Sequence, residues 1–91
     1  MTNGVSKDVV NRGHFDVTFQ GTEFHPTVQI TETTGVWASA TEIDQTNDPI
    51  SGGAHVTVQQ VVPAKNNSAT VRVWVDNVPV AIKVRVTLFV Q

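Results

Sequence analysis

Two segments of alternating residues within 70–91, joined by a tight turn, are the feature that most constrains the fold of this chain. A period of two puts the apolar side chains on one face of an extended strand. Asn77 and Val78 suit a two-residue turn between two such strands, and Pro79 suits a strand's first position because it has no N–H to donate. The sequence therefore predicts a terminal hairpin with one fully buried apolar face. Its expected cross-strand pairs are Val75 with Val80, Val73 with Ile82, and Val71 with Val84.

Four shorter alternating segments precede this hairpin, and each predicts a further strand. They cover residues 14–20, 27–33, 36–43 and 54–62. Residues 1–13 are polar apart from a short apolar pair, Val9 and Val10, which favours an arm with one short edge strand. Residues 45–53 concentrate Asn, Asp, Pro, Ser and Gly, which is the composition of a long loop.

Two of these segments carry a further expectation. In residues 36–43 the side chains that face the core are either Val36, Ala38 and Ala40 or Trp37 and Ile43. In residues 54–62 the apolar phase changes between Val58 and Val61. A phase change within a strand predicts an extra, unpaired residue, so we expect a β-bulge near Gln59 and Gln60.

The spacing of the strands predicts an all-β fold. About seven short strands recur at intervals of roughly 8–12 residues with turn residues between them, which is the pattern of an antiparallel, immunoglobulin-like β-sandwich. A small β-barrel is the alternative, because it gives nearly the same linear pattern. At 91 residues we expect one domain, the sandwich of residues 14–91, preceded by the arm of residues 1–13. Because the chain has no cysteine, its stability must come from packing.

The charge and hydropathy of the chain argue against two classes of partner. A net charge of -2 provides no overall basic field for binding nucleic acid. No stretch approaches the ~18 apolar residues of a membrane span, and residues 1–13 lack the apolar core of a signal peptide. We therefore expect a soluble protein that binds neither nucleic acid nor membrane. The sequence assigns it no compartment.

The polar face of the predicted hairpin is the candidate binding surface. It carries Arg72, Trp74, Lys83, Arg85 and Phe89. An indole flanked by cations is suited to stacking on a flat ligand and pairing with an anionic group. Lysine and arginine on the outer face of a long strand also protect it from unwanted association, so the same residues have a purely structural interpretation.

Two further groups of residues extend the list of candidates. Trp37 is a candidate platform for a sugar ring. Carboxylates near the start of the long loop are candidate calcium ligands, namely Glu42, Asp44 and Asp48. Their spacing does not match an EF-hand, and hydrogen bonds that form a turn explain the same residues.

These observations support two hypotheses of function. The first is a non-catalytic interaction domain that binds a protein partner or itself through a sheet face or a strand edge, with the final strand as the pairing segment if it lies at an edge. The second is a small carbohydrate-binding module with an aromatic platform and an optional calcium ion. No serine lies in a nucleophile motif, so we expect no catalytic residues and no enzyme cofactor.

Overall fold

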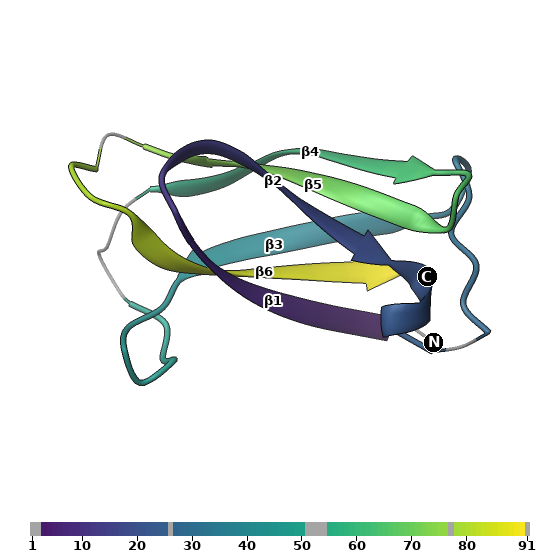
Figure 1. The fold of residues 1–91 in the computed structure, drawn as a ribbon, viewed down its shortest axis with the longest axis horizontal. Helices are drawn as coiled ribbons and strands as arrows, with labels where there is room; N and C mark the ends of the chain where they lie inside the picture. Colours follow the sequence, from purple (N-terminus) through teal and green to yellow (C-terminus); the bar gives the residue numbers. More distant parts are fainter. Residues whose placement is uncertain (1–2, 26, 51–54, 77, 91) are drawn as a thin grey trace.

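The computed structural model describes residues 3–25, 27–50, 55–76 and 78–90. Their strands form two three-stranded antiparallel sheets, with the orders β1-β6-β3 and β2-β5-β4, that stack face to face (Figure 1). The elements are β1 (Asn3–Asn11), β2 (Gly13–Gln20), the 3-10 turn η1 (Gly21–Glu23), β3 (Val36–Glu42), β4 (Val56–Ala64), β5 (Ser68–Val75) and β6 (Ile82–Val90). The predicted all-β sandwich is confirmed, with six strands in the described part of the chain instead of about seven.

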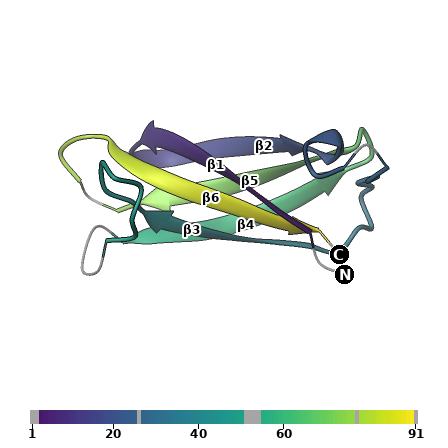
Figure 2. The same cartoon turned by 90° about the horizontal axis from the view of Figure 1, so that it is seen from below.

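The core lies between the two sheets and is built mainly from the inward-facing side chains of the two central strands. Figure 2 shows the sheet β1-β6-β3 in front of the sheet β2-β5-β4. The buried residues of the central strands are Ala69, Val71, Val73 and Val75 on β5, and Val84, Val86, Leu88 and Val90 on β6. Because valine branches at Cβ, it loses little rotamer freedom on a pleated, half-buried surface. The predicted burial of this apolar face is confirmed for β5 and for β6 from Val84 onward, whereas Ile82 is only partly buried.

The predicted terminal hairpin is wrong, because β5 and β6 lie in different sheets. β5 pairs with β2 and β4, whereas β6 pairs with β1 and β3. Val80 is 65% exposed instead of facing Val75, and the predicted turn residue Asn77 lies outside the described residues. A period of two determines which side chains face inward, but it does not determine which strand supplies the partner of the ladder.

Residues 27–33 form no strand, contrary to the prediction, and belong to the connection from β2 in one sheet to β3 in the other. Ile30 is 1% exposed and anchors this connection in the core. Its N–H donates to Oδ1 of Asn67 (2.7 Å), and the carbonyl of Asn67 accepts from the N–H of Gly21 (2.8 Å). Asn67 has a φ of 61° in the turn between β4 and β5, a left-handed conformation that asparagine tolerates. The apolar residues of this segment therefore reflect a buried anchor and not a ladder.

The structure decides between the two inner faces considered for β3. The side chains of this strand that pack against the core are Val36, Ala38 and Ala40. Trp37 is 44% exposed on the outer face, so the first interpretation is correct within the strand. Ile43 is also buried, but it follows the strand and forms an isolated bridge with Pro49. Of the predicted loop, residues 45–50 are irregular and residues 51–53 lie outside the described residues.

The predicted bulge is confirmed, and the first strand is longer than expected. In β4 the register with β5 shifts between Val58 and Gln60, which leaves both Gln59 and Gln60 exposed. At the other side of the sandwich, β1 spans nine residues and pairs with β6 along its whole length. It reaches well beyond the short edge strand that was predicted around Val9 and Val10.

Candidate functional site

The first candidate site is the edge that β1 forms in the sheet β1-β6-β3. Among the described strands its only ladder partner is β6, with Asn3 opposite Val90 and Asn11 opposite Ile82. It therefore covers a side of β6 that lacks any other partner. β6 is therefore the central strand of its sheet. It could pair with another chain, as the sequence analysis suggests for an edge strand, only if β1 were displaced.

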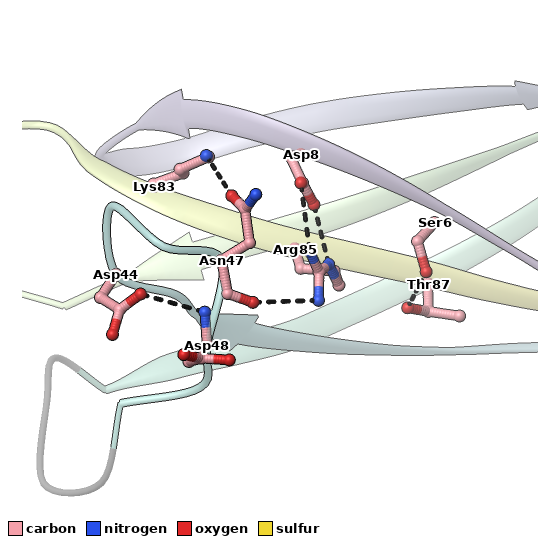
Figure 3. Close-up of polar contacts among 8 residues, drawn as sticks. All are labelled: Ser6, Asp8, Asp44, Asn47, Asp48, Lys83, Arg85 and Thr87. Carbon is pink, nitrogen blue, oxygen red and sulfur yellow. Dashed lines mark hydrogen bonds and ion pairs between the residues drawn. The ribbon is translucent and has the colours of Figure 1, made fainter.

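Polar side chains join β1 to β6 on the outer face of this sheet (Figure 3). Nε and Nη2 of Arg85 donate to the two carboxylate oxygens of Asp8, at 3.0 and 3.3 Å. Two residues further along, the hydroxyls of Ser6 and Thr87 lie 2.7 Å apart. The hydrogen bonds from Arg85 hold the pKa of Asp8 below its ordinary value. These contacts are open to solvent, and ion pairs of that kind contribute little net stability.

The loop after β3 folds onto the same outer face, at the start of β6 (Figure 3). The side-chain oxygen of Asn47 accepts from Nζ of Lys83, and its carbonyl accepts from Nη1 of Arg85 at 3.4 Å. Within the loop, Oδ1 of Asp44 accepts from the hydroxyl and the N–H of Thr46 at 2.7 and 2.8 Å. The hydroxyl bond is the main cause that lowers the pKa of Asp44.

The candidate calcium ligands do not form a metal site in this structure. Asp44 also accepts from the N–H of Asp48 at 3.0 Å, so its carboxylate closes a turn. Within the described ranges, no group of three or more His, Asp or Glu side chains is placed to hold a metal ion. The interpretation of Glu42, Asp44 and Asp48 as calcium ligands is therefore replaced by one of turn formation for the two aspartates.

An aromatic pair occupies the opposite end of this outer face. Trp37 on β3 stacks on Phe89 on β6, with ring centroids 5.9 Å apart and an angle of 17° between the planes. The ring of Phe89 lies against Gly4 on β1, where a Cβ would approach two ring carbons to 3.0 and 3.1 Å. Glycine thus leaves room for the ring to lie across the edge strand. The candidate platform Trp37 is exposed, and it is part of a two-ring surface.

Lys7 occupies an inward-facing position of β1. Its Nζ donates to the carbonyl of Thr18 on β2 (2.7 Å) and to Oε1 of Glu23 (3.0 Å), and it lies 5.0 Å from the ring centre of Phe19. The inward-facing valines on either side of it are only partly buried. A charge that points inward from an edge strand disfavours the addition of further strands. On the inner face of β1 it also takes the place of an apolar side chain between Val5 and Val9.

The connection between β1 and β2 is a hinge of one residue. Only Arg12 lies between the two strands, and Gly13 begins β2 with a φ of 69°, which glycine adopts without steric cost. The N–H of Arg12 donates to Oδ1 of Asn11 (2.9 Å), and its Nη1 donates to the carbonyl of Pro79 (2.6 Å). The chain therefore passes from one sheet to the other through a short, fully specified turn.

The second candidate site is the outer face of the sheet β2-β5-β4. Nε and Nη2 of Arg72 on β5 donate to the carboxylate of Asp16 on β2, at 3.0 and 3.4 Å. Beside this pair, the rings of His14 and Trp74 lie 4.2 Å apart with their planes tilted by 32°. A shallow, open groove of about 400 Å³ runs along this face, and its lining residues are His14, Phe15, Asp16, Gln59 and Arg72.

The structure divides the predicted binding surface between the two opposite faces of the sandwich. It places Arg72 and Trp74 on β5, and Lys83, Arg85 and Phe89 on β6. Each arginine lies opposite an aspartate of the neighbouring edge strand. Sequence reasoning missed these partners, Asp8 and Asp16, because the register between strands far apart in the chain cannot be inferred from either strand alone. The phase change that predicted the bulge could have identified Gln59 as a residue of this site.

Comparison of this chain with protein-family models, with curated proteins and with solved structures yields no match. Helical structure in the described ranges is limited to η1, and no helix there is long and apolar enough to cross a membrane. The two sites themselves are therefore the basis for a functional assignment.

Proposed function

We propose that this protein is a non-catalytic interaction domain that binds a second copy of itself by exchanging strand β1. In the exchanged dimer, β1 of each copy pairs with β6 of the other and makes the contacts that it otherwise makes within one chain. One observation carries the proposal: the first described strand, attached through a one-residue hinge, covers the edge of the last described strand.

The immunoglobulin-like class is part of this proposal, and the strand orders support it. In that fold, strands B, E and D belong to one sheet and strands C, F and G to the other. With β2 taken as strand B, the order β2-β5-β4 corresponds to B-E-D, and β3 and β6 correspond to C and F. β1 then takes the place of G, antiparallel to β6, although it precedes the other strands in the sequence. β1 therefore fills the edge that strand G fills in that fold, and the filling of such an edge by a strand from another chain is the mode of donor-strand complementation in chaperone–pilin complexes.

The one-residue connection favours exchange of β1 between two copies rather than a monomer in which β1 always stays on its own β6. Domain swapping is a low-cost route to a dimer, because the exchanged strand keeps its contacts and only the connection to it changes. When the turn at Arg12 and Gly13 opens, β1 can reach the sheet of a second molecule. Since β1 makes the same contacts in both forms, the balance depends on the hinge and on protein concentration. The ion pair between Asp8 and Arg85 is open to solvent, and Val5 and Val9 are only partly buried, which lowers the cost of detaching β1.

A disulfide lock tests the proposal, because the chain has no cysteine of its own. In the double variant Ser6→Cys/Thr87→Cys, the two positions face each other across β1 and β6, at a separation that suits a disulfide. Analytical ultracentrifugation of the wild type over a wide concentration range is expected to show monomers and dimers in equilibrium. The variant oxidised as a monomer is expected to remain a monomer at every concentration.

The matched control is Thr18→Cys/Thr70→Cys, which joins β2 to β5 at an equivalent cross-strand pair and leaves β1 free. This control should dimerise as the wild type does. Strand exchange is contradicted if the wild type stays monomeric at its highest soluble concentration. It is also contradicted if the variant with β1 locked dimerises as well as the control, a result that favours contact through a sheet face.

A further inference from the structure

We infer that the groove on the outer face of the sheet β2-β5-β4 binds a neutral carbohydrate chain. The groove lies on the sheet that does not contain β1, so the inference is independent of strand exchange. It rests on three features of the groove: an aromatic surface, a fixed pair of hydrogen-bonding groups without net charge, and an amide aimed into it by a bulge.

His14, which lines the groove, supplies the aromatic surface and is in contact with Trp74. Their rings are in contact at 4.2 Å, with His14 exposed and Trp74 partly buried beside it. A sugar ring presents C–H groups on its face and hydroxyls around its rim. Burial of that C–H face against the exposed His14 ring removes apolar surface from water, and Trp74 supports this ring from its other side.

Arg72 and Asp16 supply the hydrogen bonds. Two of the five N–H donors of Arg72 bond to Asp16, so three remain for a ligand. Both oxygens of Asp16 keep acceptor capacity. The side chain of Arg72 is 53% exposed and that of Asp16 is 46% exposed. The bidentate pairing holds donor and acceptor in one plane, which lowers the cost of ordering them on binding. Neighbouring hydroxyls of a sugar can each donate and accept a hydrogen bond, and therefore match such a pair.

The charge of the groove favours a neutral ligand over an anion. Nε of Arg72 lies 3.0 Å from Asp16, so the positive charge is already compensated. A phosphate or sulfate group that approached Arg72 would also meet the carboxylate, and like charges repel at that range. A neutral polyol meets no such penalty, since it uses the remaining donors and acceptors without displacing Asp16.

The bulge in β4 adds the third feature. A bulge inserts one unpaired residue into a strand and re-aims its side chain, and bulges are common beside binding sites. Here the register shifts between Val58 and Gln60, Gln59 has no ladder partner on β5, and it lines the groove. Its amide carries donors as well as acceptors, which suits hydroxyl groups and contributes no charge.

Titration of the full chain with defined oligosaccharides tests the inference. The probes are neutral hexasaccharides of glucose, mannose and N-acetylglucosamine, with a heparin hexasaccharide as the anionic comparison. Affinity is measured by calorimetry, and the indole N–H signals of Trp74 and Trp37 are followed by NMR. At least one neutral probe is expected to bind and to shift the Trp74 signal while leaving the Trp37 signal in place.

Two matched variants locate the site. Gln59→Ala is expected to weaken binding of the neutral probe about 3- to 10-fold, the effect of losing one hydrogen bond. Gln29→Ala makes the same change at an exposed residue between β2 and β3, and it should alter affinity by less than about twofold. Ser6→Cys/Thr87→Cys, with β1 locked, should bind the neutral probe as the wild type does.

Three results overturn the inference. One is the failure of every neutral hexasaccharide to bind, and another is tighter binding of the heparin fragment than of the neutral probes. The third is an equal effect of Gln59→Ala and Gln29→Ala on affinity, which would place the ligand elsewhere on the molecule.

Discussion

The substitution Gly21→Ala tests the junction that holds the long connection between β2 and β3 in place. Gly21 is buried, and a Cβ at this position would lie 2.0 Å from Oδ1 of Asn67. The same oxygen accepts from the N–H of Ile30 at 2.7 Å. The new methyl group must therefore displace the side chain of Asn67 and leave the N–H of Ile30 without its acceptor.

The size of the effect follows from two costs. A part-buried N–H left without a partner costs about 1–3 kcal/mol, and forcing a methyl group into a packed site costs about 1–3 kcal/mol. Because movement of the Asn67 side chain relieves part of the collision, we expect a loss of about 2–4 kcal/mol. In a domain of this size each kcal/mol corresponds to about 4–8 °C, so the melting temperature should fall by about 8–30 °C.

Thermal unfolding followed by circular dichroism measures the loss. Thr22→Ala is the matched control, since Thr22 is exposed in the same turn, and it should change stability by no more than about 0.5 kcal/mol. Asn67→Gly keeps the left-handed backbone and removes the colliding side chain, so the double variant should lose less than the sum of the two single losses. The reasoning is refuted if Gly21→Ala melts with the wild type, or if the two losses add.

Three further predictions concern β1 and the core. Asp8→Asn removes the carboxylate bonded to Arg85 and should speed dimer formation on size-exclusion chromatography, whereas Asp16→Asn, in the matching pair on the other sheet, should not. Because hydrogen bonds from Arg85 lower the pKa of Asp8, this group stabilises the folded chain above the ordinary aspartate pKa of about 3.9, and that contribution is lost as the pH falls through the lowered value. Urea midpoints measured from pH 7 downward should therefore decline below about pH 4, and a flat profile would contradict this. Leu88→Ala should cost about 2–5 kcal/mol in urea unfolding, while Thr41→Ala on the outer face should cost less than about 0.5 kcal/mol.

Local patterns in the sequence predicted the local structure of the strands. The alternation in β5 and β6 assigned the buried face correctly, because a period of two is a property of one strand and needs no partner. The phase change in residues 54–62 located the bulge for the same reason. The composition, rich in valine and threonine, favours an all-β class, and the spacing of the alternating segments predicted the sandwich, with a small barrel as the alternative.

Pairing and connectivity could not be inferred in the same way, because they depend on contacts between distant segments. The proposed hairpin joined two strands that are consecutive in sequence, whereas each of them is the centre of a separate sheet. Lys7 occupies an inward-facing position that the local pattern assigns to an apolar residue, and its partners come from β2 and η1. Prediction of the Arg72–Asp16 and Arg85–Asp8 pairs would also have required the register between the strands.

Exchange of β1 is tested most directly by mixing two single-cysteine proteins, Ser6→Cys and Thr87→Cys, under oxidising conditions. Positions 6 and 87 face each other across β1 and β6, so a disulfide between the two proteins can form efficiently only when β1 of one lies on β6 of the other. We predict a disulfide-linked heterodimer, identified by mass spectrometry of the peptide joining these positions, and none from a parallel mixture of Thr18→Cys with Thr70→Cys. If the first mixture yields no more linked heterodimer than the second, β1 does not exchange between copies and the proposed function is wrong.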